Sequence, residues 1–556
     1  MNDLLMPKLA TVVTEGYGPA RLKADMLAGL TVAIVALPLS MAIAIASGVT
    51  PDRGLYTAII GGFLVSALGG SRFQVGGPAG AFIVLVAATV TRHGVEGLLL
   101  ATFLSGLMLT LAGYLRFGKY IKLIPYPVTV GFTAGIAVII FASQIAELFG
   151  LRLAGGEPGP IVEKVPALWA ARDSFNPAAL GVAALTIGVI LVLRRLRPSW
   201  PNLLIGVAVA AAATALLALP ADTIGTRFGG IPRGLPVPAL PAFSPGLVLA
   251  VLPDAVAFTI LGAIESLLSA VVADGMTGRR HRSSMELIAQ GIANIGSALF
   301  GGICVTGTIA RTATNVRSGA TSPVSGMLHS AFLLAFMLLA APLASYIPLA
   351  ALAGVLAVVA FNMIERPAIA ALIRASRGDA AILAVTFFLV VLRDLTEGIV
   401  VGFLLGAVLF IDRMGKAVDI RTETVPRTVR AMENAGEDFG QPESPLVADD
   451  PATVIYRISG VFFFGAAASV GSVLDRIADR HRNFVIDCTE VALLDSTAAS
   501  IVEGLMRKAK RNGTRIFISG LRPDMRRLLE AHGIRPPHVT FTDTTDEATA
   551  LIAAAG

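Results

Sequence analysis

Long apolar runs of about 20 residues recur along the chain from roughly Asp25 to Asp412. A helix needs about this length to span the hydrocarbon core of a bilayer. The pattern predicts about fourteen membrane-spanning segments, centred near residues 37, 62, 85, 104, 138, 186, 210, 260, 293, 312, 332, 355, 386 and 404. The last 140 residues or so are charged, contain no such run, and alternate short apolar strands with amphipathic helical patterns.

Glycines interrupt two of these apolar segments at corresponding places, in residues 69–80 and 301–311. Each interruption follows the tripeptide Ser-Ala-Leu, and we predict that each leads into a helix too short to cross a bilayer. Pro78 suits the first position of one short helix, and Thr308 suits the N-cap of the other. Matching breaks in the two halves of a membrane protein are typical of a transporter's binding site.

The two breaks belong to an internal repeat. The Ser-Ala-Leu tripeptides begin at Ser66 and Ser297, and a second matching pair, Ile-Pro followed by Gly, occurs at Pro125 and Pro348. The similar spacing of the two pairs indicates homologous halves. Seven spans per half is an odd number, so the halves would run in opposite directions and place a site near the middle of the bilayer.

Composition and charge agree with a membrane protein. Of the 556 residues 55% are hydrophobic and 15% charged, and the net charge is +6; the mean hydropathy is +0.75. With the N-terminus in the cytoplasm, inside loops hold about nineteen Lys and Arg residues and outside loops about eight, as the positive-inside rule requires. Topology therefore explains the basic excess, and no nucleic-acid partner is expected. The first run lacks a signal-peptide cleavage pattern and is interpreted as a retained span.

Two charged residues, Glu265 and Arg311, lie inside predicted spans. A charge in the hydrocarbon centre costs about 3 kcal/mol, so such residues normally face a cavity or a partner. Ser269 lies one helical turn after Glu265, on the same face. An alternative is that Glu265 and Arg311 only neutralise each other as a structural pair.

An inverted repeat would aim the N-termini of both short helices at one point. Helix N-termini attract anions, and the guanidinium of Arg311 suits oxyanions, so the site favours a small anion. Glu265 is a natural place for H⁺ or Na⁺ to bind, which would lower the repulsion felt by the anion. The alternatives are that Gly76-Gly77 only allows close helix packing, and that Ser40, Ser269 and Thr308 only bond back to their own helices. Glu147 and Asp254 lie near span ends and are expected to be interfacial.

Several segments resemble motifs of the sulfate permease family. They are Gly48–Tyr56, Gly77-Pro78, Glu265–Leu268 and Ala310–Asn315. The resemblance covers nearly the whole chain. It implies a 7+7 inverted repeat with core and gate subdomains and an anion held between the third and tenth helices. By position, the resemblance implies that the substrate-binding residues are Leu39, Ser40, Ile43, Ala79, Gly80, Thr308, Ala310 and Arg311. It implies that Glu265 and Ser269 take part in cation coupling.

Some members of the family carry a polar residue where Leu39 stands and an aromatic one where Ala79 stands. Those departures leave the transported anion open among sulfate, bicarbonate, chloride and dicarboxylates. The acidic residue Glu265 resembles the cation-coupled members more than the channel-like ones.

The polar tail resembles a STAS domain, the module of anti-sigma-factor antagonists. Strands are predicted at Val454–Ile458, Val461–Phe464, Phe484–Cys488 and Arg515–Ile518, and helices at Ala466–Asp479, Ser496–Lys510, Pro523–Ala531 and Asp546–Ala554. Ser496 and Thr497 lie where the antagonists carry a phosphorylated hydroxyl, and Thr497 aligns best. The alternative, which we favour, is that Asp495 or Ser496 simply caps the following helix.

We therefore predict an α-helical membrane protein with about 14 transmembrane segments and a cytoplasmic α/β STAS domain. The domains are a cytoplasmic N-terminal segment (1–24), a transmembrane anion-transport domain (25–413), a linker (414–450) and the STAS domain (451–556). The predicted function is secondary active transport of a small anion across the cell inner (plasma) membrane by an elevator movement, with both termini cytoplasmic. A homodimer and a cytoplasmic regulator of the STAS domain are expected from the resemblance.

Three other functions remain open: an uncoupled exchanger or channel of the same fold, a nucleobase-type transporter of related architecture, and a sensor. The STAS-like tail and Arg311 count against the nucleobase transporter, and the intact anion site counts against the sensor. No nucleophile motif, P-loop or redox pair supports an enzyme, and His93, His281 and His329 show no metal-ligand spacing. No cofactor is expected besides the coupling ion.

Overall fold

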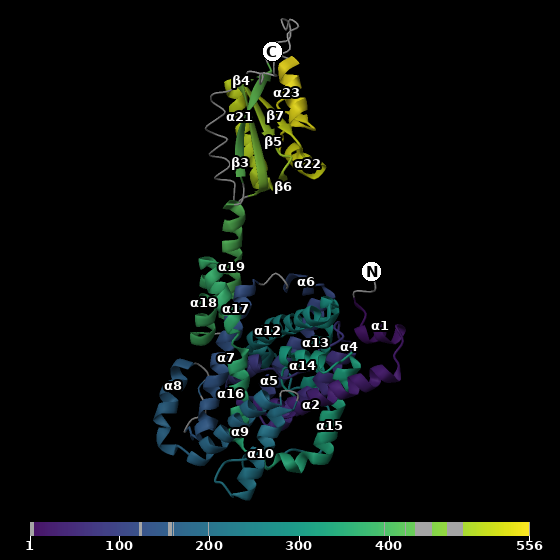
Figure 1. Cartoon of the computed structure of the whole chain (residues 1–556), viewed down its shortest axis with the longest axis vertical. Coiled ribbons are helices and arrows are strands. Elements are labelled where there is room, and N and C mark those ends of the chain that lie inside the picture. The colour runs from purple at the N-terminus through teal and green to yellow at the C-terminus, as the bar shows by residue number, and fades with distance from the viewer. Residues whose placement is uncertain are drawn as a thin grey trace, which may run out of the picture. The chain divides into compact units, whose positions relative to one another are not determined.

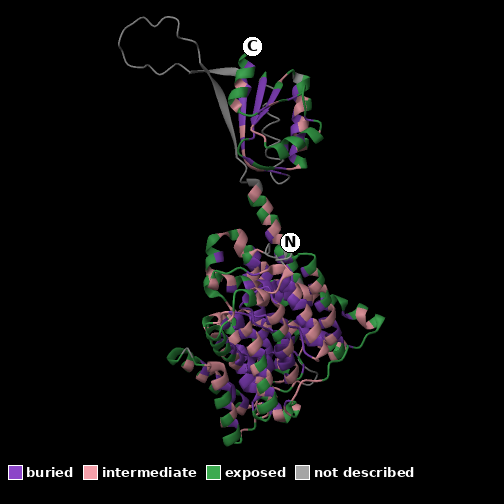
Figure 2. Ribbon diagram, turned by 90° about the vertical axis from the view of Figure 1, so that its right-hand side faces the viewer, coloured by how far each residue is buried: buried purple, intermediate pink, exposed green. Residues whose placement is uncertain are grey.

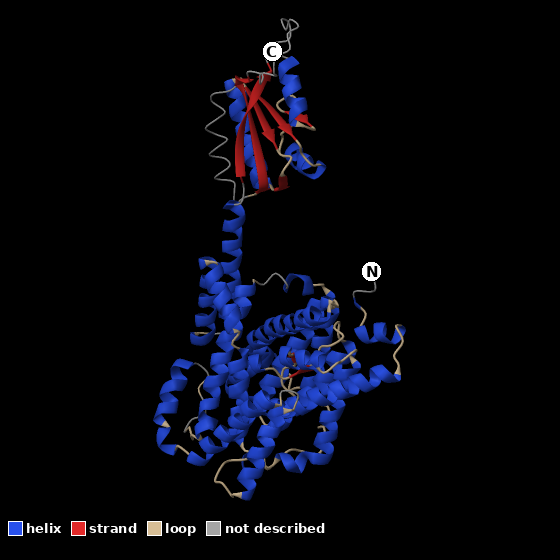
Figure 3. Ribbon diagram, viewed as in Figure 1, coloured by secondary structure: helices blue, strands red, loops and turns tan. Residues whose placement is uncertain are grey.

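A computed structural model describes residues 5–121, 125–153, 158, 161–197, 200–393, 395–416, 419–428, 447–463 and 482–554. The chain forms two compact units, Met1–Leu404 and Leu405–Gly556. The first unit is helical and the second is a sheet covered by helices (Figure 1 and Figure 3).

Helices long and apolar enough to cross a membrane account for much of the first unit. Among the described residues there are seven: Pro19–Ala46, Gly80–Tyr114, Tyr126–Phe149, Pro177–Leu196, Pro245–Thr277, Val324–Ala344 and Leu349–Ala375. Every predicted span centre falls within a described helix, either one of these seven or another one. The segments near residues 85 and 104 both lie in α5 (Ile83–Tyr114). The helical geometry of α5 is interrupted between them at Gly94, where φ is 68°.

One group of helices packs around the two glycine breaks. It comprises α2 (Pro19–Ala46), α3 (Pro51–Tyr56), a π-helix (Thr57–Gly61), α4 (Gly62–Leu68), α5, α12 (Pro245–Thr277), α13 (Ser283–Leu299), α14 (Ile309–Arg317) and α15 (Val324–Ala344). Glycines bring some of these helices close together. A Cβ at Gly106 of α5 would lie 2.7 Å from the carbonyl oxygen of Gly291 in α13. Small residues of this kind are typical of membrane helix interfaces.

A second group packs around α7 (Tyr126–Phe149) and α16 (Leu349–Met363). Its other members are α9 (Pro177–Leu196), α10 (Asn202–Leu216), α17 (Arg366–Ala375) and α18 (Arg377–Leu392). Pro125 and Pro348, the second matching pair of the repeat, each stand directly before one of the two central helices, as N-caps in extended conformation. The repeat therefore also marks equivalent helix starts. The long helix α19 (Leu395–Lys416) crosses the boundary between the two units.

The remaining described helices are short connections, α1 (Lys8–Thr14), α6 (Gly118–Ile121), α8 (Ile161–Ala170) and α11 (Ile224–Phe228). Buried residues concentrate inside the helical unit, while exposed ones line its periphery (Figure 2). Many of the exposed residues are large and apolar, as expected for surfaces that face lipid.

The second unit is built on a sheet with strand order β3-β4-β5-β7-β8, and β6 also pairs with β4. The strands are β3 (Asp419–Thr428), β4 (Val447–Phe462), β5 (Asn483–Asp487), β6 (Val491–Leu494), β7 (Arg515–Ser519) and β8 (Thr540–Thr542). Within this sheet the described pair β3–β4 is antiparallel, and the other described pairs are parallel.

Helices cover both faces of this sheet, as its alternating pattern requires. Val454, Phe484 and Ile516 pack with residues of α21 (Ser496–Asn512) and α22 (Pro523–Ala531). The neighbouring positions Ile455, Val485 and Phe517 pack with Ala548 and Ile552 of α23 (Thr545–Ala554).

The structure corrects three predictions for the tail. The segment 414–450 is not simply a linker, because α19 ends in it at Lys416, β3 lies within it and β4 begins in it. The strand predicted at Val454–Ile458 and the start of the one predicted at Val461–Phe464 belong to one strand, β4, which ends at Phe462 and whose register shifts between Gly460 and Val461. Gly460 has a φ of 97°, so this glycine permits an irregularity within the strand and does not end it. Strands β6 and β8 were not predicted, and the helix predicted at Ala466–Asp479 lies outside the described residues.

Candidate functional site

The two glycine breaks meet inside the helical unit as a short antiparallel strand pair, seen as two small strands in Figure 3. β1 (Gly76–Gly77) pairs with β2 (Thr306–Gly307), so Gly76 lies opposite Gly307 and Gly77 opposite Thr306. The repeat that relates Ser66 to Ser297 also relates Gly76 to Gly307, so these two equivalent glycines pair with each other, as expected for two halves related by a twofold axis. The pairing also satisfies backbone groups that a broken helix would leave without partners.

The helices after the breaks begin close to the predicted positions. α14 begins after Thr308, which has the extended conformation of an N-cap, but the Thr308 hydroxyl donates to the Val75 carbonyl at 3.4 Å and does not cap the helix. The prediction that Pro78 is the first helical residue is wrong. The chain stays extended through Ala79 (φ −115°, ψ 144°) and then forms a 3₁₀ turn, Gly80–Phe82, that leads into α5. Pro78 therefore remains in the crossing strand region.

Glycines at the crossing make room for two long polar side chains. A Cβ at Gly77 would lie 1.8 Å from Nη1 of Arg311, and a Cβ at Gly307 would lie 1.4 Å from Nε2 of Gln74. Each glycine thus faces a polar side chain from the other half of the repeat. These close approaches give the glycine breaks a role beyond close helix packing.

Arg311 projects from α14 into the interior and is 1% exposed. Its Nη2 donates to Ser40 Oγ at 3.1 Å and to the Pro78 carbonyl oxygen at 3.2 Å. Nε and Nη1 are buried and have no partner among the described residues. Ser40 itself donates to the Ala36 carbonyl at 2.7 Å, so this hydroxyl bonds back to its own helix and also accepts from Arg311.

Glu265 and Arg311 do not form an ion pair in the described part of the chain. Glu265 Oε2 is buried without a hydrogen-bond partner there. Ser269, one turn along α12, donates to Thr312 Oγ1 of α14 at 3.0 Å, and the Val75 amide donates to the same oxygen at 3.2 Å. The Ser269 hydroxyl therefore ties α12 to α14 and to the first break, and does not bond back to its own helix.

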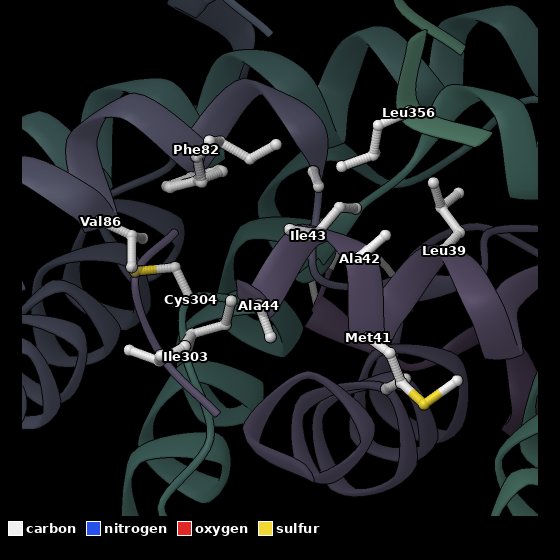
Figure 4. Packing of buried hydrophobic residues seen from close by; sticks show 14 of the residues in the cluster. Leu39, Met41, Ala42, Ile43, Ala44, Phe82, Val86, Ile303, Cys304 and Leu356 are labelled. Carbon is white, nitrogen blue, oxygen red and sulfur yellow. The ribbon is translucent and has the colours of Figure 1, made fainter. Parts of the chain in front are cut away.

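The apolar candidates lie on two elements near Arg311. Leu39, Ile43 and Ala79 are all buried, at 7%, 2% and 3% exposure. In Figure 4, Leu39 and Ile43 extend from α2 on the side where Leu356 of α16 lies, and all three belong to the main buried cluster. Gly80 is partly exposed, and Ala310 is exposed at the start of α14. Ser40, Pro78 and Arg311 are thus brought into contact, whereas Ala310 is not in the interior.

Sequence reasoning missed several buried polar residues that hold the broken backbone in place. Gln74 Nε2 donates to the backbone and side-chain oxygens of Ser266, both at 3.1 Å. The Asn294 side chain accepts from the Val305 amide and donates to its carbonyl, at 3.0 and 2.8 Å. Glu286 Oε2 accepts from the amides of Gly70 and Ser71 at 2.8 and 3.0 Å. Their position as polar residues within apolar runs could have identified them in the sequence. Such residues are rare in membrane spans, and when buried they usually form hydrogen bonds with a partner.

A separate cavity of about 260 Å³ opens between α7, α9 and α16. Its polar lining includes Glu147, Arg152, Asn176 and Asp222, and none of the candidate site residues. Glu147 pairs with Arg227 at 2.5 Å, and Asp254 pairs with Arg92 at 2.7 Å. We interpret these as ion pairs near the ends of spans.

In the second unit, Asp495 is the N-cap of α21, and its side chain accepts from the Ala498 amide at 2.9 Å. From the sequence, this capping role is favoured for the loop over a phosphorylated hydroxyl at Thr497. Ser496 and Thr497 are both exposed.

Two broken helices that cross as paired strands inside a helical bundle, beside a buried arginine, define a multi-pass membrane protein of the transporter class. The chain belongs to the sulfate permease family, whose sequence model matches residues 22–386. A STAS domain model matches residues 444–548.

Known proteins match this chain over most of its length. The Bacillus subtilis (strain 168) protein named "Putative sulfate transporter YvdB" is 39% identical over 94% of this chain and 95% of its own length. The bicarbonate transporter BicA of a Synechocystis species is 30% identical over 92% of this chain and 90% of its own length.

Solved structures confirm the fold. The transmembrane domain of a cyanobacterial bicarbonate transporter, BicA, matches with a TM-score of 0.62 and 31% identity, covering 69% of this chain and 98% of that domain. The overall structure of SLC26A9 matches with a TM-score of 0.83 over 100% of this chain and 93% of its own, at 17% identity. Both the helical membrane fold with its inverted repeat and the C-terminal STAS domain are therefore confirmed.

Proposed function

We propose that this protein is a secondary active transporter of a small anion of the sulfate, bicarbonate or dicarboxylate class. The observation that carries the proposal is the fully buried guanidinium of Arg311, which has two nitrogens without protein partners in the described part of the chain. Buried donors are nearly always paired, and a planar guanidinium pairs best with an oxyanion. The names of the two relatives, a sulfate and a bicarbonate transporter, support this substrate class.

The anion would lie where the 3₁₀ turn Gly80–Phe82 and α14 begin. First-turn amides have no partner within their helix and point out from the N-terminus, where the helix dipole is positive. Arg311 adds a full charge beside them, while Leu39, Ile43 and Ala79 form an apolar wall. The Ser40 and Thr308 hydroxyls would reach the anion by turning their protons away from the Ala36 and Val75 carbonyls. An apolar wall around a few donors excludes water and strengthens their attraction for the anion.

Coupling would run through Glu265. Its carboxylate has a buried oxygen without a partner in the described residues, and its helix is tied to α14 by the Ser269–Thr312 hydrogen bond. Binding of H⁺ or Na⁺ to Glu265 would remove a negative charge near the anion. The cation and the anion would then favour each other's binding by the same free energy.

Alternating access would come from an elevator movement of the helices around the crossing, the core, against those around α7 and α16, the gate. We place the protein in the cell inner membrane as a homodimer with both termini in the cytoplasm. The STAS domain would be the docking site of a cytoplasmic regulator. An uncoupled exchanger or channel of the same fold is the second candidate.

Transport assays on the purified protein in proteoliposomes test the proposal. Uptake of labelled sulfate, bicarbonate, chloride, fumarate and succinate is measured with and without an inward H⁺ or Na⁺ gradient. We expect saturable uptake of at least one anion, accelerated by one of the gradients. Failure to transport any of the five anions would contradict the proposed substrate class.

The variant Glu265→Gln separates the two candidates. We expect it to transport without responding to the gradient, because the amide no longer binds the cation. Full gradient dependence in this variant would remove Glu265 from coupling. Large uncoupled currents in the unmodified protein would favour the exchanger or channel.

A further inference from the structure

The first break lies against one face of α14 and is bonded to it at several points. Asn315 Nδ2 donates to the Phe73 carbonyl oxygen at 2.9 Å, and the Val75 amide donates to Thr312 Oγ1 at 3.2 Å. Asn315 is three residues after Thr312, so both side chains lie on the same face of the helix. This face of α14 therefore holds the chain just before β1.

Contacts nearer the start of α14 continue this attachment. The Thr308 amide donates to the Val75 carbonyl oxygen at 3.1 Å. Beyond β1, the Pro78 carbonyl oxygen accepts from Arg311 Nη2 at 3.2 Å. The backbone on both sides of β1 is thus bonded to α14, and the attachment of the first break also places Pro78 beside Arg311.

Thr312 is the residue of α14 at which a second helix joins this attachment. Its side chain is buried, and its Oγ1 also accepts from the Ser269 hydroxyl of α12 at 3.0 Å. A hydroxyl oxygen has two acceptor lone pairs, and these two donors occupy both. The Thr312 oxygen therefore joins the first break, α12 and α14 at one point.

The Val75 amide depends on this oxygen more than Ser269 does. Val75 is fully buried, and a buried amide without an acceptor is costly. Ser269 lies within a helix, where a serine hydroxyl can turn back to the carbonyl four residues earlier. Loss of the Thr312 hydroxyl would therefore leave the amide of the first break, and not the hydroxyl of α12, without a partner.

We propose that Thr312 is a positioning residue for the anion site. Its hydroxyl oxygen holds the first break against α14, so that the 3₁₀ turn Gly80–Phe82 after the break and the guanidinium of Arg311 meet the anion together. This inference rests on the proposed function, since it assumes that Arg311 binds the transported anion.

Detachment of the first break from α14 would lower the apparent affinity for the anion. Only the attached state presents both parts of the site, the turn and the guanidinium, to the same anion. When the state that can bind is only partly populated, the apparent affinity falls by the populated fraction. Removal of the Thr312 hydroxyl should therefore raise the half-saturating anion concentration and leave the maximal rate nearly unchanged.

Paired substitutions at Thr312 test this role on the full-length protein in proteoliposomes. Thr312→Val keeps the shape of the side chain and removes the acceptor, whereas Thr312→Ser keeps the hydroxyl. One buried amide without an acceptor predicts a rise of about tenfold in the half-saturating anion concentration for Thr312→Val, with the maximal rate within about twofold. Thr312→Ser should stay within about threefold of the unmodified protein.

Two other threonines provide matched controls. Thr89 is equally buried, and its hydroxyl donates to the Leu85 carbonyl of its own helix at 2.8 Å. Thr314 is partly exposed on α14, and its hydroxyl donates to the Ala310 carbonyl at 2.8 Å. Thr89→Val and Thr314→Val should leave the half-saturating concentration unchanged, even where the thermal unfolding midpoint falls.

A further variant covers the case in which Thr312→Val does not fold. Thr312→Cys has a side chain of similar size with a weak acceptor, so its half-saturating concentration should exceed that of Thr312→Ser. A merely structural threonine would lower the amount of folded protein or the thermal unfolding midpoint without moving the half-saturating concentration.

The inference is overturned if Thr312→Val, or Thr312→Cys in its place, keeps the original half-saturating concentration, or if Thr312→Ser raises it as much. Arg311→Ala in the same series distinguishes this failure from a failure of the proposed function. If Arg311→Ala abolishes saturable uptake while Thr312→Val changes nothing, only the role of Thr312 is refuted. If the unmodified protein transports none of the tested anions, both are refuted.

Discussion

At the scale of single residues, the site depends on what glycine lacks. Arg311 crosses from α14 to Ser40 on α2 over the backbone of Gly77, and a methyl group at Gly77 would occupy the place of its Nη1. The arginine was identifiable from the sequence because a charge in an apolar span is costly. The need for glycine opposite it was not, since that need arises from a contact between residues 234 positions apart in the chain.

Gly77→Ala should therefore impair transport more than it impairs folding. A Cβ that would lie 1.8 Å from Arg311 Nη1 forces the guanidinium away from Ser40 and Pro78. Overpacking of this kind costs about 1–3 kcal/mol, so we expect uptake to fall by at least about tenfold. Uptake in proteoliposomes and the thermal unfolding midpoint are measured together.

Gly188→Ala is the matched control, because nothing lies within 4 Å of a Cβ at this exposed position in α9. It should transport normally and be stabilised by up to about 1 kcal/mol through helix propensity. Equal activity of the two variants would contradict the role given to Gly77.

At the scale of elements, polar side chains from neighbouring helices hold the breaks and the helix ends. Asp25 of α2 accepts from the Thr321 amide at 2.6 Å, the Ser322 hydroxyl at 2.5 Å and the Tyr17 hydroxyl at 2.8 Å. Burial and the hydrogen bond to Asp25 raise the pKa of Tyr17 to about 12, so this hydroxyl remains a donor at neutral pH. The carboxylate thereby ties the start of α15 to α2 and to the N-terminal segment.

Asp25→Asn should loosen the connection between α14 and α15. It removes the charge and one acceptor from a fully buried cluster, and each hydrogen bond to a charged group contributes about 1.5–3 kcal/mol. We expect a lower thermal midpoint and faster amide hydrogen exchange in residues 318–325. Asp173→Asn, at a side chain that is 89% exposed, should change neither. Unaltered exchange in the Asp25 variant would refute the tie.

Sequence patterns predicted these elements well where the signal was local. All fourteen span centres fall within helices, and α22 (Pro523–Ala531) has the predicted bounds. Pairing between distant segments was not predictable. β1 and β2 are only two residues long and form because the two breaks meet, and β3 lies in a polar segment whose strand character depends on its partner β4. The helix start predicted at Pro78 failed for the same reason, since the chain there is held extended by the crossing.

At the scale of the whole molecule, the two units have separate cores and should respond separately to pH. In the second unit, Asp487 is buried at the end of β5 and accepts from the Thr489 hydroxyl at 2.6 Å and from Arg457 Nε at 2.9 Å. Burial alone would raise the pKa of Asp487, but the hydrogen bonds from Thr489 and Arg457 outweigh it and leave the pKa below the usual 3.8.

A carboxyl whose pKa is lowered by folding stabilises the folded state above its unfolded pKa, and that contribution is lost as the pH falls through the folded value. The second unit should therefore lose stability below about pH 4. Asp487→Asn should lower the free energy of unfolding at neutral pH and make it depend less on pH below about pH 4. Hydrogen exchange in β5 and β7 of the full-length protein, followed from pH 7 to pH 3, measures both effects. The same loss of stability at acid pH in the variant would contradict this role of Asp487.

The central claim is that Arg311 binds the transported anion at the crossing of the two breaks. The most direct measurement is the affinity of the purified protein for the anion it transports, compared between the unmodified protein, Arg311→Ala and Arg317→Ala. Arg317 lies on the same helix but is exposed, so its loss changes the net charge equally without touching the site. Loss of a buried charged donor predicts a fall in affinity of about 30-fold or more for Arg311→Ala and little change for Arg317→Ala. Equal affinities in all three proteins would contradict the account.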